Sequence, residues 1–456
     1  MSEFNKEVSE IRKTNIPINP NVHNLRNTMC FKTWNDIVIS LPQKNVKWCC
    51  KTQYTKDQMK ELTFDIDTLS LDFLINHPIL QQRKYDLSGG TRTQDCIGCW
   101  KSEDAAGHSV RTEYNSNFEE VWVHRLKKSE NHPKKSIQFH QEIQEHDGFR
   151  FIEIELTNKC NMACVYCWEG NSSRWQKETG KKMPDTEEAL FDKTIEILNE
   201  YWDKDLHKKD YIEFSLLGGE PFFTEHMYKF IEDFVVNLNK KKNNQQQIVI
   251  TLTTNLNFPK KKFNRFIELV EETPNIKYMM QLSGEAIGKK SEYIRWGLNW
   301  DNWNSNLDLF LIEGKRLDNL TIGFGCAHNS LSYPYFIEFL KYLNDKLTQY
   351  NFNKDIYMHT NWVDNPEYLS VRTLSKSFEK HADDIIEYFV NDFKHPVHNK
   401  QRYVEVLKTL KSHIIGDVSD ETRIDAYNEF TKLEKRRNIS FSSIFPHFSE
   451  LIKIDK

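Results

Sequence analysis

The feature that most limits how this chain can fold is a regular alternation of short apolar strands and amphipathic helices from Arg150 onward. The predicted strands are residues 151–156, 211–217, 248–253, 276–282, 321–326 and 356–362. Helices are predicted between them at residues 185–201, 224–238, 261–271, 303–312 and 335–347. Because strands joined through a helix usually pair in parallel, this alternation predicts a parallel α/β unit, either doubly wound or a partial barrel.

The two ends of the chain do not follow this rhythm. Residues 1–149 are irregular, and an irregular segment of this kind often depends on bound metal for stability. The stretch Asn131–Lys135 is expected to be a linker, and the chain after residue 370 is predicted to be helical, most strongly at Asp383–Phe393 and Tyr403–Lys411. The expected domains are an N-terminal domain at 1–149, an α/β domain at 150–370 and a helical C-terminal extension at 371–456.

Charge and hydropathy argue against several function classes. The 62 Lys and Arg residues are balanced by 66 Asp and Glu, so no basic face typical of nucleic-acid binding is expected. The sequence has no apolar run of about 18 residues that would span a membrane, and its first residues lack the apolar stretch of a signal peptide. We therefore expect a cytoplasmic protein. Disulfides are improbable in that reducing compartment, and the nine cysteines are expected to bind metal or take part in catalysis.

Three cysteines share one short loop. Cys160, Cys164 and Cys167 lie in the segment Cys-Asn-Met-Ala-Cys-Val-Tyr-Cys, directly after the first predicted strand. Three thiolates so close in sequence can converge on one metal centre, and soft thiolates select iron–sulfur clusters or zinc. A [4Fe–4S] cluster held by three cysteines leaves one iron open for an outside ligand. A zinc loop with a distant fourth ligand, or three buried apolar thiols, are the alternatives.

This loop resembles the C-x3-C-x-aromatic-C signature of the radical S-adenosylmethionine (SAM) enzymes, with Tyr166 in the aromatic position. The resemblance implies a partial (β/α)6 barrel similar to a TIM barrel, and a catalytic [4Fe–4S] cluster whose open iron is chelated by SAM. It also implies reductive cleavage of SAM to a 5′-deoxyadenosyl radical, which abstracts a hydrogen atom from the substrate. An external reductant such as flavodoxin or ferredoxin is the expected electron donor.

Further motifs occur in the order that the resemblance implies. The candidates are Gly218, Gly219 and Glu220 after the second predicted strand, Thr254 and Asn255 after the third, and Ser283 and Arg295 at and beyond the end of the fourth. The Gly-Gly-Glu triplet resembles the motif that holds the SAM amino group. The pair after the third strand resembles a polar SAM contact, and the serine and arginine resemble contacts to the SAM carboxylate. Polar residues at the carboxyl ends of parallel strands also meet at one ligand-binding edge, where a carboxylate can pair with an ammonium group.

A second group of cysteines lies in the N-terminal segment and consists of Cys30, Cys49, Cys50, Cys96 and Cys99. The last two form a C-x2-C knuckle, and Cys30 with one of the adjacent pair would complete four ligands. Neighbouring residues of an extended chain point in opposite directions, so only one of Cys49 and Cys50 need serve. Which of the two is the ligand stays open, with Cys49 as the first choice. The context resembles SPASM and twitch domains, in particular those radical SAM proteins whose twitch-type domain precedes the barrel. This implies a second, auxiliary [4Fe–4S] cluster, and a four-cysteine zinc knuckle is the alternative.

Residues beyond the later strands are candidates for substrate contact, since they share the predicted ligand edge. They are Glu285, His328, Asn329, Asn361, Trp362 and Asp364, with capping or turn roles as the alternative for those after the fifth and sixth strands. Glu285 could contact either SAM or the substrate. Cys326, within the fifth strand, is either a buried apolar thiol or a hydrogen-atom donor that faces the substrate. The C-terminal extension could close the lateral opening of the barrel or carry a partner surface.

Together these features predict a cytoplasmic radical SAM enzyme that abstracts a hydrogen atom from a peptide or a small molecule. The resemblance to twitch-containing enzymes favours a peptide, and a sugar or nucleotide-like substrate is the next choice. A glycyl-radical activase is a weaker alternative, because the sequence has no additional ferredoxin-type C-x2-C-x2-C run. A non-catalytic binding module stabilised by zinc or by a cluster is the rival from a different class.

Overall fold

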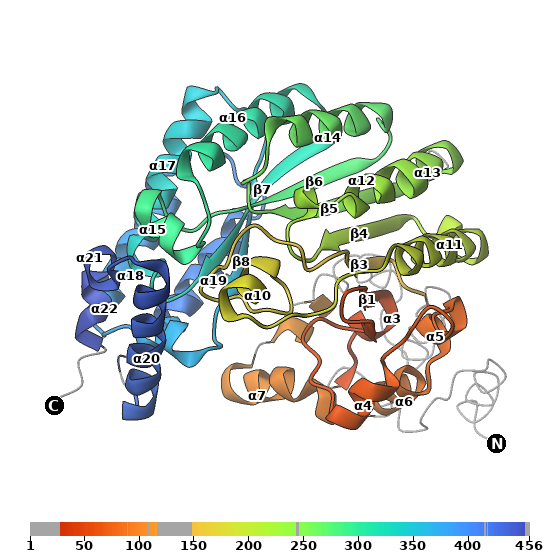
Figure 1. Cartoon of the computed structure of the whole chain (residues 1–456), viewed down its shortest axis with the longest axis horizontal. Coiled ribbons are helices and arrows are strands. Elements are labelled where there is room, and N and C mark those ends of the chain that lie inside the picture. The colour runs from red at the N-terminus through yellow and green to blue at the C-terminus, as the bar shows by residue number, and fades with distance from the viewer. Residues whose placement is uncertain are drawn as a thin grey trace, which may run out of the picture. The chain divides into compact units, whose positions relative to one another are not determined.

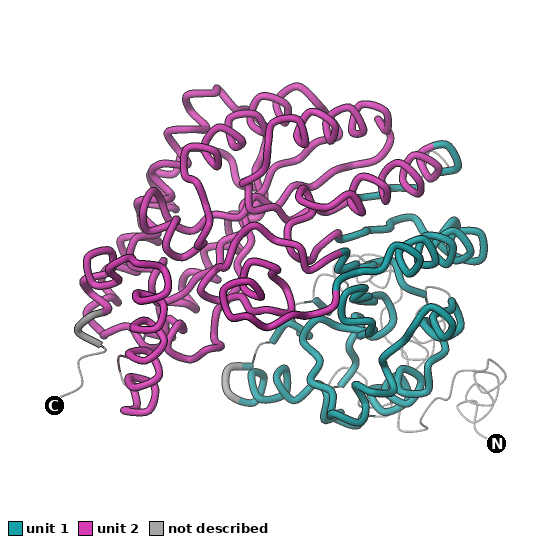
Figure 2. Tube along the Cα trace, viewed as in Figure 1, with its two compact units in different colours: residues 1–156, 185–215, 240–249 teal, residues 157–184, 216–239, 250–456 magenta. Residues whose placement is uncertain are grey.

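The computed structural model describes residues 28–88, 90–107, 109–112, 114–115, 148–242, 246–414, 416 and 418–451. The chain divides into two compact units, each built from several segments (Figure 2). Unit 1 comprises residues 1–156, 185–215 and 240–249, and unit 2 comprises residues 157–184, 216–239 and 250–456. The predicted linker at 131–135 lies outside the described residues, and the three-domain division stays a prediction.

The strands form an eight-stranded sheet in the order β2-β1-β3-β4-β5-β6-β7-β8. Their bounds are Asp36–Ser40 (β1), Asn45–Lys47 (β2), Phe151–Glu155 (β3), Tyr211–Leu217 (β4), Gln247–Thr254 (β5), Lys277–Ser283 (β6), Leu320–His328 (β7) and Tyr357–Trp362 (β8). Strand β1 pairs in parallel with β3, β6 with β7, and β7 with β8, whereas β1 and β2 are antiparallel. The predicted strands are thus confirmed as β3 to β8 in a mixed α/β fold, while closure into a partial barrel stays a prediction.

The helices between the strands agree closely with the predicted ranges. Their bounds are Glu188–Lys204 (α11), His226–Lys229 (α12), Val236–Lys241 (α13), Lys260–Glu272 (α14), Trp300–Arg316 (α16) and Phe336–Gln349 (α17). Figure 1 shows α14, α16 and α17 along the outer side of β6 and β7. The helix predicted at 224–238 is interrupted, because a π-helical segment at Phe230–Val235 separates α12 from α13. Two short helices, Ser173–Thr179 (α10) and Gly288–Ile294 (α15), were not predicted.

The expectation that the N-terminal segment is irregular is wrong in part, because β1 and β2 belong to the sheet. Short helices accompany them at Lys32–Asn35 (α3), Lys56–Glu61 (α4), Leu71–Asn76 (α5), Pro78–Ser88 (α6) and Ile97–Ala106 (α7). Strand β1 is five residues long and wholly buried, so it shows no alternation of polar and apolar residues. Its partner β3 supplies the parallel ladder, from Asp36 opposite Phe151 to Ser40 opposite Glu155. A strand stabilised by so distant a partner leaves little local signal.

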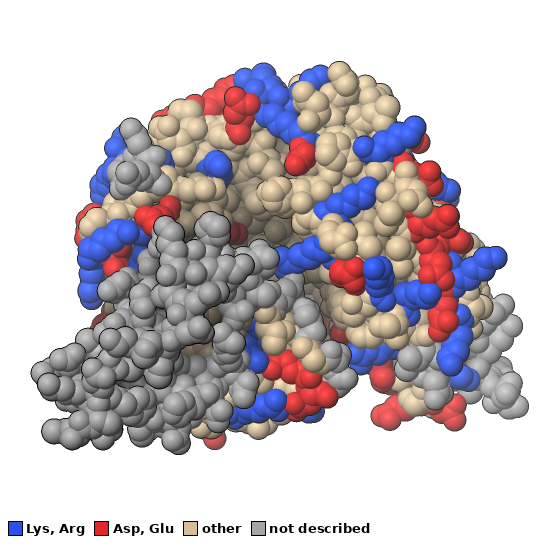
Figure 3. Space-filling model, turned by 180° about the vertical axis from the view of Figure 1, so that it is seen from behind, with Lys and Arg blue, Asp and Glu red and all other residues tan. Residues whose placement is uncertain are grey.

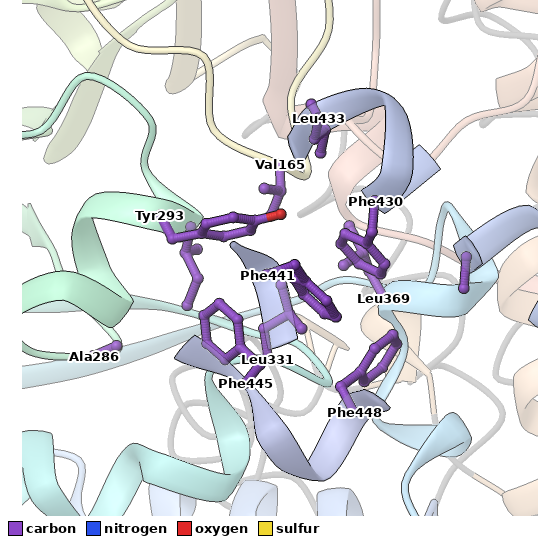
Figure 4. Packing of buried hydrophobic residues seen from close by; sticks show 12 residues of the cluster. Val165, Ala286, Tyr293, Leu331, Leu369, Phe430, Leu433, Phe441, Phe445 and Phe448 are labelled. Atoms are coloured by element: carbon purple, nitrogen blue, oxygen red, sulfur yellow. The ribbon is translucent and has the colours of Figure 1, made fainter. Parts of the chain in front are cut away.

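The C-terminal extension is helical, as predicted. Its helices are Phe378–Glu387 (α18), Lys400–Ser412 (α19), Asp420–Arg437 (α20), Phe441–Ile444 (α21) and Pro446–Leu451 (α22). Asn399, directly before α19, pairs with the backbone of the outer strand β8. Its side chain accepts from Met358 N at 3.1 Å and donates to Met358 O at 2.7 Å. The last helices share a buried cluster with the segment around Val165, which includes Phe430, Phe441 and Phe445 (Figure 4). Each buried aromatic side chain of this kind contributes about 1.5–3 kcal/mol.

The core of unit 2 is aromatic where it supports the end of β4. Phe222 is fully buried and stacks on Phe258, with ring centroids 4.3 Å apart, and Phe266 and Phe310 meet it edge-on. Aromatic pairs of this geometry add about 0.5–1.5 kcal/mol beyond the area they bury. The packing holds the turn that follows β4 in place.

The surface carries both signs of charge. On the face shown in Figure 3, Lys and Arg side chains are interspersed with Asp and Glu, as expected from the near-balanced charge. Among the described helices, none is both long and apolar enough to cross a membrane.

Candidate functional site

The loop that carries Cys160, Cys164 and Cys167 follows β3 and belongs to unit 2. A hydrogen bond of 2.9 Å from Cys167 N to Cys164 O closes a tight turn between the last two cysteines. The three thiols lie within electrostatic reach of one another, and burial raises the pKa of each, to about 12 for Cys167. Neutral thiols of this kind become thiolates when a metal centre binds and releases their protons.

The backbone of this loop is anchored by the last residue of α15 and by the segment that follows this helix. Ala163 N donates to Trp296 O at 2.7 Å, and Val165 N donates to Ile294 O at 2.8 Å. Two backbone bonds on either side of Cys164 restrict the positions that its thiol can occupy. The loop is thus held in a defined shape by protein contacts alone.

Helix α10 supports the same loop from its other side. The Ser173 hydroxyl contacts both the N–H and the carbonyl of Cys160 at 3.1 Å. The Trp175 indole Nε1 donates to Cys164 O at 2.8 Å. Two of the three cysteine backbones are therefore fixed by one short helix, which sequence reasoning missed.

The two glycines after β4 form a turn that lies close to the cysteine loop. Both adopt the left-handed region, with φ of 90° at Gly218 and 49° at Gly219. A Cβ placed on Gly219 would lie 2.2 Å from Lys159 O, the backbone oxygen just before Cys160. Glu220 N donates to that same oxygen at 2.9 Å. The close backbone approach that these glycines permit is thus an approach to the cysteine loop itself.

Glu220 is buried and held by three donors. Its carboxylate accepts from Phe222 N at 3.1 Å, from the Thr254 hydroxyl at 2.8 Å and from Asn255 N at 2.6 Å. Burial raises the pKa of Glu220 to about 7, although these hydrogen bonds oppose the shift. A carboxylate has about four acceptor positions, so an ammonium group can still bind. The structure therefore brings together three of the predicted site residues.

The end of β5 also contacts the cysteine loop directly. The Asn255 side-chain Nδ2 donates to Asn161 Oδ1 at 2.9 Å and lies 3.9 Å from Cys160 Sγ. Its own Oδ1 accepts from Asn257 N at 2.8 Å, which fixes the orientation of the amide. Asn255 thus links the carboxyl end of the strand to the first cysteine.

Arg295 and Glu285 form a buried ion pair beside the loop. Arg295 Nη2 lies 2.6 Å from Glu285 Oε2, and Nε lies 3.0 Å from Oε1. The Tyr166 hydroxyl donates to Glu285 Oε1 at 3.1 Å, and the guanidinium lies 5.7 Å from the Tyr166 ring centroid. The aromatic residue of the cysteine motif therefore joins this pair. The predicted contact of Arg295 with the SAM carboxylate stays a prediction, and it would use the Nη1 group outside the pair.

Residues at the ends of β6 and β7 are buried. Ser283 ends β6, and its carbonyl accepts from the Trp303 indole at 3.0 Å. The Asn329 side chain accepts from Leu331 N at 2.9 Å, which is the turn role named as its alternative. His328 Nε2 lies 3.0 Å from the Tyr403 hydroxyl, and burial lowers the pKa of His328 to about 3, so the ring is neutral.

The remaining substrate candidates lie after or at the end of β8, and Cys326 lies within β7. Asn361 is exposed, the Trp362 ring meets His413 edge-on at 5.0 Å, and Asp364 accepts from Ser370 Oγ at 3.0 Å. Cys326 is fully buried, and burial raises the pKa of its thiol. Substrate contact by these residues stays a prediction.

The N-terminal cysteines lie in unit 1, where four of them line one cavity. Its lining includes Cys30, Cys49, Cys96 and Cys99 together with Lys32, Lys51, Arg83 and Arg111. Cys50 is exposed and is not part of the lining. Arg83 Nη2 donates to Cys96 Sγ at 3.1 Å, and Lys51 N donates to Cys49 Sγ at 3.4 Å. Basic side chains and N–H donors around thiols stabilise the thiolate form that a metal centre requires.

The donor chemistry of both cysteine sets fits an iron–sulfur cluster. Each set offers soft sulfur ligands with nearby N–H donors, and hydrogen bonds to sulfur are one means by which proteins adjust such clusters. Among the described residues, no three His, Cys, Asp or Glu side chains are gathered closely enough to hold a single metal ion. The ligand sets stay predictions.

Sequence reasoning missed several residues that shape the site. They are Ser173, Trp175 and Glu178 on α10, Asn161 in the cysteine loop, and Arg437 at the end of α20. Ser173 and Trp175 contact the loop from 13 and 11 positions away, whereas Arg437 contacts Ala163 across 274 positions. No local pattern could have found the contact of Arg437.

Comparison with known proteins supports the iron–sulfur assignment. A family model described as a 4Fe–4S single cluster domain, which occurs in radical SAM enzymes, matches residues 147–286. This segment includes the three-cysteine loop and Glu220, and it ends before Arg295. No curated protein matches the chain. The match supports an iron–sulfur protein of the radical SAM type.

Proposed function

We propose that this protein is a radical SAM enzyme whose catalytic [4Fe–4S] cluster is held by Cys160, Cys164 and Cys167. The observation that carries the proposal is the placement of Glu220. Its backbone N–H is bonded to Lys159 O, one residue before the first cysteine, while its carboxylate is fixed by three donors. A carboxylate fixed at this loop is suited to hold the amino group of a ligand on the open iron.

The surrounding residues would complete the SAM site. The Glu220 carboxylate would accept hydrogen bonds from the SAM ammonium group. Thr254 and Asn255 orient this carboxylate by donating hydrogen bonds to it. Arg295 and Ser283 are the proposed contacts of the SAM carboxylate. Glu285 pairs with Arg295, so the guanidinium would already be oriented before SAM binds.

When bound, such a cluster would supply the electron that cleaves SAM to methionine and a 5′-deoxyadenosyl radical, and this radical would abstract a hydrogen atom from an unreactive C–H bond of the substrate. The protein orients SAM and excludes water from the site. We propose a peptide as the substrate, with a small molecule as the second choice, and flavodoxin or ferredoxin as the reductant.

The N-terminal cysteines are proposed to hold a second [4Fe–4S] cluster in a twitch-like domain. Cys30, Cys49, Cys96 and Cys99 line the cavity described above, and Cys49 rather than Cys50 faces it. The basic residues of the lining, Arg83 among them, would balance the negative charge of four thiolates.

Anaerobic reconstitution with iron and sulfide tests the proposal. Two clusters predict about eight irons and eight sulfides per chain, falling to about four in Cys164→Ser. Adding SAM to the reduced protein should change the electron paramagnetic resonance (EPR) spectrum of the wild type and leave that of Cys164→Ser unaltered. Zinc bound in place of iron, with no response to SAM, would instead identify a non-catalytic binding module.

A further inference from the structure

Helix α20 of the C-terminal extension ends against the cysteine loop. Arg437, the final residue of α20, donates from Nη2 to Ala163 O at 2.9 Å, between Cys160 and Cys164. Its guanidinium carbon lies 5.2 Å from the Trp175 ring centroid and 5.1 Å from that of Trp296. The side chain is 1% exposed, so it is a buried cation at the centre of the loop.

One carboxylate accompanies this cation. Glu178 on α10, with 9% of its side chain exposed, accepts from Arg437 Nε at 3.0 Å and from Nη2 at 3.3 Å. The Nη1 group is buried and has no hydrogen-bond partner among the described residues. Buried N–H groups without an acceptor are rare in folded proteins and ask for an explanation.

A second donor next to Arg437 is in the same situation. Tyr293 on α15 is fully buried, and its hydroxyl has no hydrogen-bond partner among the described residues. It is close enough to Arg437 to interact electrostatically. Figure 4 shows the hydroxyl pointing toward Val165, between Cys164 and Cys167. Two unpartnered donors, from α20 and α15, beside the same loop indicate an acceptor that the described residues do not supply.

Apolar packing holds the C-terminal half of α20 against the cysteine loop. Phe430 and Leu433 of α20 are buried in the cluster that contains Val165, and Phe441 stacks on Phe430 with centroids 4.0 Å apart (Figure 4). Arg437 follows on the same helix, so its guanidinium is held in place rather than free to turn to solvent.

We propose that Arg437 is a positioning residue of the catalytic cluster, whose Nη1 donates to a sulfur on the Cys164 side and raises the cluster's reduction potential. This inference rests on the proposed function. One electron from the external reductant makes the cluster more negative, and a nearby cation with a free N–H favours that reduced form. The C-terminal extension thus serves the site, because it delivers this cation to the cysteine loop.

Two substitutions at one ion pair are expected to act in opposite directions. Arg437→Gln removes the cation, so the midpoint potential should fall. Glu178→Gln removes the anion beside it, so the potential should rise. Both variants weaken the same contact between α20 and α10, and a purely structural effect would therefore shift the two potentials in the same direction.

The midpoint potential is measured by redox titration of the reconstituted protein, followed through the EPR signal that Cys164→Ser lacks. We expect Arg437→Gln to change the ratio of reduced to oxidised cluster by at least tenfold, or about 59 mV for a one-electron couple. Arg437→Lys keeps the charge without the planar fork and should give an intermediate value. Arg436→Gln is the matched control, since Arg436 also contacts Glu178 but is 35% exposed and screened by solvent.

The outcomes separate the two proposals. A wild-type chain that binds no cluster refutes the proposed function. If the wild-type protein binds a cluster, two results refute the role of Arg437 alone. One is an unchanged midpoint potential in Arg437→Gln, and the other is a shift of the potential in the same direction in Arg437→Gln and Glu178→Gln. If Arg437→Gln fails to fold, Glu178→Gln decides, because an unchanged or lower potential in that variant overturns the inference.

Discussion

Replacing Gly219 by alanine should damage the cysteine loop by more than the glycine's backbone conformation explains. Gly219 has φ of 49°, and a non-glycine residue in this region costs roughly 1–2 kcal/mol. The new Cβ would also lie 2.2 Å from Lys159 O, and this neighbour is backbone rather than a movable side chain. Displacing it would strain the bond of 2.9 Å from Glu220 N to the same oxygen.

Gly288 provides a matched control for this substitution. Its φ of 54° is similar, and a Cβ there would meet nothing within 4 Å. Gly288→Ala should therefore cost only the backbone term of roughly 1–2 kcal/mol, and the effect of alanine on the unfolded chain is common to both variants. The clash and the weakened hydrogen bond should add roughly 1.5–4.5 kcal/mol in Gly219→Ala.

Equilibrium unfolding in urea and iron content after reconstitution measure the two consequences. Gly219→Ala should unfold at a lower urea concentration than Gly288→Ala, and it alone should lose the iron of the catalytic site. Equal stability of the two variants, with full iron in both, would show that Gly219 does not press on the cysteine loop and would refute this reasoning.

Three further predictions concern the two sites. Iron analysis should show that Cys96→Ser loses about four of about eight irons and that Cys50→Ser keeps all of them. Loss of iron in Cys50→Ser but not in Cys96→Ser would contradict the proposed ligand set. Because burial raises the pKa of Glu220 to about 7, its carboxylate is increasingly protonated below that pH. SAM affinity, measured by equilibrium dialysis under anaerobic conditions, should thus fall as the pH drops, whereas affinity in Glu220→Gln should be weak and free of this dependence. Glu285→Gln leaves Arg295 as a buried cation without its carboxylate, so the free energy of unfolding should fall by about 3–5 kcal/mol. An unchanged urea concentration at the midpoint of unfolding would contradict this prediction.

The sequence was most informative where the signal is local. Strands β3 to β8 were found because each is an apolar run between amphipathic helices. The cysteine motif could be recognised because its three cysteines lie in one short loop. Strand β1 was missed, since its five buried residues are stabilised by pairing with β3, more than 100 positions away. The role of Arg437 could not be predicted from the sequence for the same reason, because its contact with Ala163 spans 274 positions.

The structure also gives some motif residues contacts that the sequence did not predict. The missing side chain of Gly219 makes room for Lys159 O of the cysteine loop. The Thr254 hydroxyl donates to Glu220, and its contact with SAM stays a prediction. A motif cannot distinguish direct contact with a ligand from support of a neighbouring residue.

Formation of 5′-deoxyadenosine from SAM tests the central claim most directly. The reconstituted protein, given dithionite as the reductant, should release 5′-deoxyadenosine that chromatography detects, and Cys164→Ser should release none. An iron-loaded wild-type protein that leaves SAM intact, or product that forms equally in Cys164→Ser, would contradict the account.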